Sequence, residues 1–273
     1  MSATKSMRAF LGVFMLIITI LWLGPIFVSF FGAFTESKAL TSTDVILVFT
    51  WDNFKQAIEV PHLGRYILNT IIITFSSVVL ITIISSTAAF SMSRLRFKGR
   101  KFIYAILLMT LMIPQTSLAI PIFFINKTFH LFNNYLALIL PYTALGIPFS
   151  LIILKNFFDQ FPKEVEEAAI MDGASPLRVF SQILFPNSLS SVSIVVIWAF
   201  MQSWNEFLFA TLFMTDNSMK TLAMAPVIFQ SVYETQVGGL LAFLILSSIP
   251  VIVAYLSLQR YFERGLTSGA VKG

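Results

Sequence analysis

The strongest constraint on this chain is a set of six apolar stretches, each long enough to cross a lipid bilayer. They cover approximately residues 9–34, 67–92, 102–125, 135–157, 188–214 and 238–259. The hydrocarbon core of a bilayer needs about 20 predominantly apolar residues per helix. The stretches are continuous rather than alternating in short segments, so they predict helices and not a barrel. We therefore expect an all-α integral membrane protein with six transmembrane helices.

The composition agrees with a membrane protein. Hydrophobic residues make up 57% and charged residues 11% of the 273 residues, and the mean hydropathy of +0.84 is far from that of soluble domains. The first stretch follows Lys5 and Arg8. It is longer than the apolar core of about 7–15 residues in a signal peptide, so we expect a retained anchor. Because the chain has no Cys, and because His62 and His130 are isolated, we expect no metal site.

The basic residues predict the orientation of these helices. If the amino terminus lies in the cytoplasm, inner segments hold thirteen of the eighteen Lys and Arg residues. The five in outer segments are Lys38, Lys55, Arg65, Lys127 and Lys220. Cytoplasmic loops carry such an excess, so we expect a multi-pass membrane protein with both termini in the cytoplasm. Loops that face the headgroups of the lipid bilayer then explain the net charge of +5, and no nucleic-acid partner is expected.

Prolines interrupt two of the stretches. Pro114 and Pro121 lie in the third, and Pro141 and Pro148 lie in the fourth. Each removes a backbone hydrogen bond, so we expect the helices to bend or break there. Such breaks either surround a cavity or serve packing alone. Between the second and third stretches, residues 93–101 are basic and have no acidic partner, which predicts a tight inner loop whose charges set the topology.

The longest charged interruption between apolar stretches covers residues 161–186. Pro162 suits a first helical position and Gly173 suits a left-handed helix stop, which predicts a short helix between them. Ser175 and Pro176 are typical of the N-cap and first residue of a second helix. The resulting helix–turn–helix is either a docking site for a partner or an ordinary solvated loop.

The same residues resemble the signature of the permease subunits of ATP-binding-cassette importers, in which Glu-Ala-Ala is followed by Gly and then by an Ile-x-Leu-Pro end. The matching positions are Glu167, Ala168, Ala169, Gly173, Ile183 and Pro186. Phe185 stands where the family usually has Leu. The resemblance implies the fold of type I (MetI-like) importer permeases, with a cytoplasmic coupling helix within about residues 162–186. It also implies contacts with an ATPase subunit through Glu164, Glu167, Ala168, Ala169, Asp172, Gly173, Ile183 and Pro186.

The resemblance also implies the location, which is a bacterial or archaeal cell membrane, and the partners. The chain would pair with a second, related permease subunit, two cytoplasmic ATPase subunits would dock on the pair, and an extracytoplasmic solute-binding protein would deliver the sugar. No Gly-x-x-x-x-Gly-Lys-Ser/Thr phosphate loop occurs in the sequence. We therefore expect ATP and Mg²⁺ on the ATPase, no cofactor on this chain, and a transporter subunit rather than an enzyme.

The end of the chain carries a second resemblance. Residues 263–273 are polar and rich in glycine, which predicts a frayed tail that does not continue the sixth helix. They are similar to the ending of maltose-type carbohydrate permeases, which reaches between the two ATPase subunits. This implies ATPase contacts at Gly265, Thr267, Gly269, Val271 and Lys272. We therefore divide the chain into a first helix with its outer loop (1–65), a permease core (66–262) and a cytoplasmic tail.

Glu206 is the one acid inside an apolar stretch. Ionisable groups are costly in lipid, so it is a candidate functional residue in the substrate pathway. With Gln202 and Asn205 it would bond sugar hydroxyls or close an outer gate. The other interpretation is a structural hydrogen bond to a neighbouring helix. The run 204–207, Trp-Asn-Glu-Phe, is similar to a recurrent element of sugar-importer permeases.

Together these features predict the transmembrane permease subunit of an ATP-driven importer that carries a carbohydrate, of oligosaccharide size, into the cytoplasm. The carbohydrate comes from the resemblance in the tail and in residues 204–207, whereas the residues alone also fit amino-acid or phosphate cargo. One alternative is an ion-coupled secondary transporter that uses Glu206 as its proton or ion site. Another is a membrane scaffold that only recruits a partner. ATP dependence of uptake separates the three.

Overall fold

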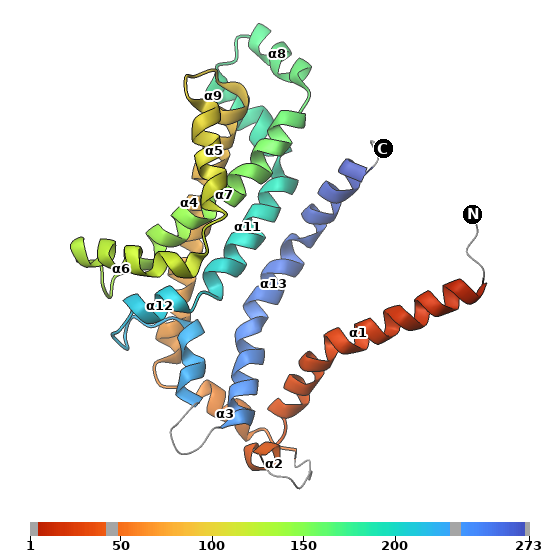
Figure 1. Cartoon of the computed structure of the whole chain (residues 1–273), viewed down its shortest axis with the longest axis vertical. Coiled ribbons are helices and arrows are strands. Elements are labelled where there is room, and N and C mark those ends of the chain that lie inside the picture. The colour runs from red at the N-terminus through yellow and green to blue at the C-terminus, as the bar shows by residue number, and fades with distance from the viewer. Residues whose placement is uncertain (1–4, 42–48, 230–235, 271–273) are drawn as a thin grey trace. The chain divides into compact units, whose positions relative to one another are not determined.

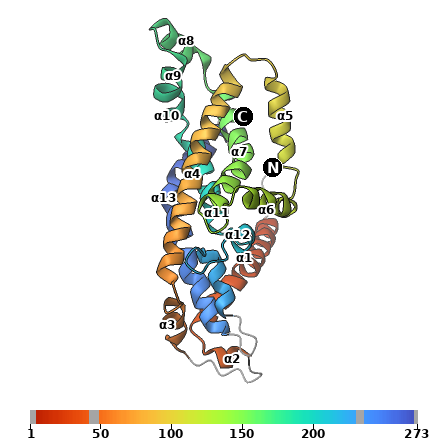
Figure 2. The same cartoon turned by 90° about the vertical axis from the view of Figure 1, so that its left-hand side faces the viewer.

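The chain is built from helices, as the computed structural model shows (Figures 1 and 2). The structure describes residues 5–41, 49–229 and 236–270. The chain divides into two compact units: Met1–Leu63 with Ala225–Ile249, and Gly64–Met224 with Pro250–Gly273. The all-α class predicted from the apolar stretches is confirmed.

The first unit contains the amino-terminal span. Its helices are α1 (Lys5–Ala33), α2 (Ser37–Thr41), α3 (Asp52–Ile58), most of η3 (Leu222–Phe229) and the first part of α13 (Val237–Ala270). The apolar side chains of α1 are largely exposed, as expected of a helix that contacts lipid. Buried Asn53 ties α3 to the end of α1, because its amide donates hydrogen bonds to the backbone oxygens of Ala33 (2.9 Å) and Thr35 (2.7 Å).

The second unit contains most of the remaining helices. They are α4 (Leu63–Arg94), α5 (Arg100–Thr110), η1 (Gln115–Leu118), α6 (Ala119–Thr128), α7 (Leu136–Gln160), α8 (Lys163–Met171), α9 (Pro176–Val179), η2 (Phe180–Leu184), α10 (Phe185–Asn187), α11 (Leu189–Trp204), α12 (Leu208–Phe213) and the last part of α13. α7 packs against α11 and contacts α4. Figures 1 and 2 show α8 beyond the ends of α4, α7 and α11.

Two apolar clusters form the core of the second unit. One includes the fully buried side chains of Leu154 and Phe158 on α7, toward the α8 end. The other includes Leu138 at the opposite end of α7 and Phe213 on α12. α7 therefore contributes buried side chains to both clusters, one near each of its ends.

The prediction of six spans holds if each bent helix pair counts as one span. Within the described residues, four helices are long and apolar enough to cross a membrane, and two bent pairs bring the number to six. The third predicted span, 102–125, is not one helix, because Arg100–Thr110 and Gln115–Thr128 meet at 100°. The fifth predicted span, 188–214, is also not one helix, because α11 ends at Trp204, ten residues before the predicted end of the span.

The prolines of the third and fourth stretches differ in their effects. α5 has ended before Pro114, so the predicted interruption occurs there. Pro121 lies in the first turn of α6, where a backbone N–H has no helical partner to lose. α7 is one continuous helix through Pro141 and Pro148, so of the predicted bend or break, no break occurs there. Both prolines are buried in the packed interior of the second unit.

The predicted frayed tail is wrong for most of its length. α13 continues through Ala270 and includes Gly265, Thr267 and Gly269. Each glycine costs a helix about 1 kcal/mol relative to alanine. An established helix gains a hydrogen bond with every added residue, so this cost does not stop it. Val271 and Lys272 lie outside the described residues.

Candidate functional site

The helix–turn–helix of residues 161–186 forms almost as its sequence predicts. α8 stops at Gly173, whose φ of +83° is the left-handed conformation that glycine adopts without a steric cost. The N–H of Gly173 donates to the oxygen of Ile170 and that of Ala174 to the oxygen of Ala169, both at 2.9 Å. Pro162 precedes the first helical residue rather than occupying it, which is a shift of one position.

The start of the second helix is also confirmed. Ser175 is the N-cap of α9, and its hydroxyl accepts a hydrogen bond from the N–H of Arg178 at 3.4 Å. Pro176 is the first helical residue, where its missing N–H costs nothing. Both caps are local, so a run of a few residues was enough to predict them.

The outer surface of α8 and its turn is exposed. We call this surface the α8 tip and define it by its exposed apolar side chains, Val165, Ile170, Met171 and Leu177, together with Gly173. Met171 is 88% exposed and Leu177 is 73% exposed. Four of the predicted contact residues are also exposed and border the α8 tip: Glu164, Glu167, Ala168 and Asp172. An apolar surface ringed by carboxylates is typical of a protein-binding site.

Three predicted contact residues lie away from this surface or are less accessible. Ala169 is half-buried and packs against the core of the second unit. Ile183 lies in η2 and Pro186 in α10, on the helical segment that leads to α11. The structure therefore brings the first part of the signature to the α8 tip and leaves its end in the connection to the membrane.

The residue that sequence reasoning missed is Glu166. It is the buried residue of α8, and both of its carboxylate oxygens accept hydrogen bonds from the Nε of Arg94, at 2.8 and 2.6 Å. A second nitrogen of Arg94, Nη2, also bonds to Glu166 and donates to the backbone oxygen of Phe158 at 2.5 Å. Residues 93–101 therefore do have an acidic partner, and that prediction was wrong. The partner lies 72 residues away, so no local spacing could reveal it.

The hydrogen bonds extend from Arg94 into the bundle. Its Nη1 donates to the hydroxyl of Ser93 at 2.7 Å, and that hydroxyl donates to Asp159 at 2.5 Å. Asp159 also accepts from Lys155, one helical turn earlier on α7, at 2.5 Å. Lys155 in turn lies 5.1 Å from the ring centre of Tyr104 on α5. One polar network thus joins the ends of α4, α5, α7 and α8.

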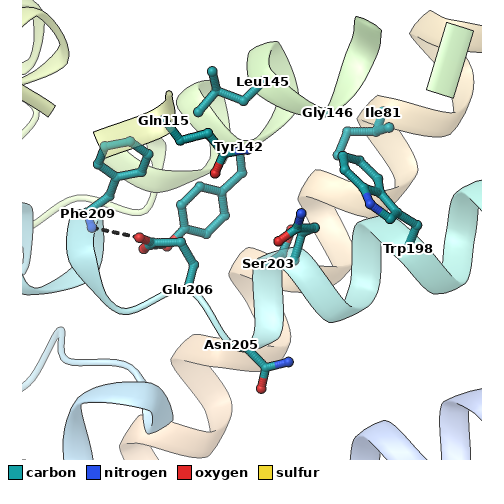
Figure 3. Close-up of a pocket in the computed structure, with 11 residues that line it drawn as sticks. Ile81, Gln115, Tyr142, Leu145, Gly146, Trp198, Ser203, Asn205, Glu206 and Phe209 are labelled. Carbon is teal, nitrogen blue, oxygen red and sulfur yellow. Dashed lines mark hydrogen bonds between the residues drawn. The ribbon is translucent and has the colours of Figure 1, made fainter. Parts of the chain in front are cut away.

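A second candidate site surrounds Glu206, where α11 has ended and α12 begins (Figure 3). One carboxylate oxygen accepts from the N–H of Phe209 at 2.8 Å. The other accepts from the N–H of Ala210 at 3.1 Å and from the hydroxyl of Tyr142 on α7 at 2.5 Å. Glu206 therefore caps α12 and joins it to α7. The structural hydrogen bond to a neighbouring helix, one of the interpretations of Glu206, is present.

The carboxylate borders a cavity of about 110 Å³. Its lining combines aromatic rings, amides and hydroxyls with a few aliphatic side chains: Ile81, Gln115, Tyr142, Leu145, Gly146, Trp198, Gln202, Ser203, Asn205, Glu206 and Phe209. Gln202 and Asn205 thus line the same pocket as Glu206, and their role in a substrate pathway stays a prediction. The amide of Asn205 donates to the oxygen of Met201 at 3.0 Å, so it serves its own helix end. None of the lining residues is basic.

The fold is a bundle of membrane helices with an exposed helix–turn–helix at one end and a polar pocket at a helix break. Residues 81–268 match the model of the family described as the binding-protein-dependent transport system inner membrane component, and the chain belongs to this family. The match includes both the α8 tip and the Glu206 pocket.

Relatives and solved structures agree with the family. The trehalose/maltose transport system permease protein MalG of Thermococcus litoralis is 39% identical over 228 residues, which cover 82% of each chain. The crystal structure of a bacterial ABC transporter that imports the acidic polysaccharide alginate contains a chain with a TM-score of 0.81 and 22% identity, covering 96% of this chain and 99% of that one. The alginate transporter bound to its alginate pentasaccharide-loaded periplasmic protein gives a TM-score of 0.72 at 15% identity, covering 94% and 95%. The fold is that of an ABC importer permease.

Proposed function

We propose that this chain is the permease subunit of an ATP-driven importer that carries an oligosaccharide into the cytoplasm. The observation that carries the proposal is the α8 tip, an exposed apolar turn that lies within the residues matched by the family model and in the segment that resembles the importer signature. A cleft in a cytoplasmic ATPase subunit would accept this surface, and Glu164, Glu167, Ala168 and Asp172 would contact its rim. ATP and Mg²⁺ would bind to the ATPase, and this chain would hold no cofactor.

The assembly would contain a second permease subunit, two ATPase subunits and a solute-binding protein. The description of the family as binding-protein-dependent supports the last of these, as does the alginate transporter, which was crystallised with its loaded periplasmic protein. The excess of Lys and Arg in alternate loops supports a cytoplasmic α8 tip with both termini on the same side. The predicted tail contacts, Gly265, Thr267, Gly269, Val271 and Lys272, would then also face the ATPase pair.

An oligosaccharide is the cargo that the relatives and the pocket support together. The MalG relative belongs to a trehalose/maltose transport system. In the pocket, the ring of Trp198 can pack on a sugar face, and the amides of Gln115 and Gln202 can bond sugar hydroxyls. Because the pocket contains the carboxylate of Glu206 and no basic side chain, its charge favours neutral sugars over the uronates of alginate. At about 110 Å³ it would hold part of one sugar ring.

Uptake into proteoliposomes tests the proposal. The whole complex with its binding protein should accumulate a labelled neutral oligosaccharide when ATP is inside, and should stop when ATP is replaced by a non-hydrolysable analogue. An ion gradient without ATP should drive no uptake. Uptake driven by the gradient alone would instead establish the ion-coupled alternative. That alternative has less support here, because hydrogen-bond donors already occupy the Glu206 carboxylate.

A further inference from the structure

We propose that Arg94 is a positioning residue that joins α8 rigidly to the membrane helices, so that movement of a docked ATPase reaches the spans instead of only rotating α8. The proposal rests on the proposed function and adds a residue outside the signature. Arg94 is the last residue of α4 and is not one of the residues that define the α8 tip.

The first argument is that few side chains of α8 are buried against the bundle. Of its nine residues, only Glu166 is buried. Short connections lie on either side of the helix, one at residues 161–162 and one at 172–175. A helix joined only by two turns would tilt under load. The ion pair is therefore the main attachment of α8 to the bundle, together with the half-buried Ala169.

The second argument is the geometry of the guanidinium. One planar group at the end of α4 bonds to a carboxylate on α8, a backbone oxygen of α7 at Phe158, and the hydroxyl of Ser93. Three elements are thus fixed at one point with several donors in a rigid fork. A lysine would keep the charge, but its single ammonium on a flexible stem does not reproduce the planar arrangement of donors that reaches all three acceptors.

The third argument is the surrounding charge. A cavity of about 500 Å³ lies beside the pair, and three further basic residues line it: Arg96, Arg100 and Lys163. This positive surrounding attracts the carboxylate of Glu166 and keeps it on the side of α8 that faces the basic residues. The arrangement therefore selects one orientation of α8 relative to α4 and α7.

The test compares Arg94→Lys with Arg96→Lys in the full complex. Both substitutions keep the charge and both residues line the same cavity, but Arg96 makes no hydrogen bond to any of the residues described by the structure. We expect Arg94→Lys to retain binding-protein-stimulated ATP hydrolysis while the number of sugars moved per ATP falls about 2- to 30-fold, the range of measured coupling effects. Arg96→Lys should leave this ratio unchanged. An unchanged ratio in an assembled Arg94→Lys complex would overturn the proposal.

A second measurement applies if the subunit with Arg94→Lys does not assemble into the full complex. Because the chain has no Cys, spin labels can be placed at Thr87→Cys on α4 and Met171→Cys on α8, both exposed positions. In the isolated subunit, Arg94→Lys should broaden the distance distribution between the labels, and Arg96→Lys should not. An equally narrow distribution in both would refute the rigid joint. If instead the wild-type complex moves no sugar on ATP, the proposed function fails, while this distance measurement still decides the role of Arg94.

Discussion

Arg94 at the end of α4 and Glu166 on α8 form an ion pair that is almost closed to solvent, with side chains only 13% and 9% exposed. They are 72 residues apart in the sequence. The pair has two consequences that can be separated by experiment, one for coupling, as proposed above, and one for stability.

The stability of the subunit should depend on whether the two charges are both present or both absent, because a single unpaired charge is costly. Arg94→Gln or Glu166→Gln alone leaves one buried charge unpaired and should cost about 3–5 kcal/mol of unfolding free energy. The double substitution Arg94→Met with Glu166→Leu removes both charges and should cost less than either single change. Thermal unfolding in detergent measures this order. If the double variant is the least stable of the three, the unpaired charge is not the main cost of the single substitutions, and the prediction is wrong.

Substitution of Gly173 should abolish transport through docking rather than folding. Gly173 and Gly99 have nearly the same left-handed φ, +83° and +85°, and a Cβ at either position meets no atom within 4 Å. Valine at either site should therefore cost about 1–2 kcal/mol in backbone strain. Only Gly173 lies on the α8 tip, so Gly173→Val should lose uptake while Gly99→Val keeps most of it. Both should reach the membrane in normal amounts, as measured by immunoblotting of membrane fractions. Comparable uptake by the two variants would argue against a docking role for the turn.

Glu206 should tolerate glutamine much better than alanine. In Glu206→Ala, the N–H groups of Phe209 and Ala210 and the hydroxyl of Tyr142 lose their acceptor, at about 1–3 kcal/mol for each unsatisfied buried group. Glutamine keeps one acceptor oxygen for one of the two N–H groups, and its amide can donate to Tyr142, so one N–H group loses its acceptor instead of three groups losing theirs. We therefore expect Glu206→Ala to lower the melting temperature much more than Glu206→Gln. An ion-coupled transporter predicts a different pattern, with uptake lost in both variants.

The charge of the same pocket should set the preference for neutral sugars. Gln202 lines the pocket and is exposed, so Gln202→Arg places a cation near Glu206. Two charges about 4 Å apart interact by roughly 1–4 kcal/mol near a protein surface. Competition by a uronate oligosaccharide against uptake of a neutral one should therefore increase about tenfold, which corresponds to about 1.4 kcal/mol. Gln202→Met, similar in size but uncharged, is the matched control. Equal effects of Arg and Met would place the selectivity elsewhere in the complex.

The sequence predicted those features that depend on neighbours along the chain. Gly173 stops α8 because few other residues adopt its φ, and Ser175 caps α9 through an N–H three residues away. The spans followed from the length of the apolar runs. The same local reasoning allowed a break at Pro141 and Pro148, whereas α7 continues through both buried prolines. It was wrong at the tail, because helix propagation continues past isolated glycines.

The amino-acid sequence by itself determined that the chain is a helical membrane protein, and it located the turn at Gly173 and the acid at Glu206, since hydropathy, backbone preference and the cost of a charge in lipid are properties of single residues or short runs. Only the tertiary structure decided their partners. Tyr142 lies 64 residues from Glu206, and Arg94 lies 72 residues from Glu166. Polar groups withdrawn from water must find donors or acceptors wherever packing brings them, and packing depends on the whole bundle rather than on the spacing of residues in the chain.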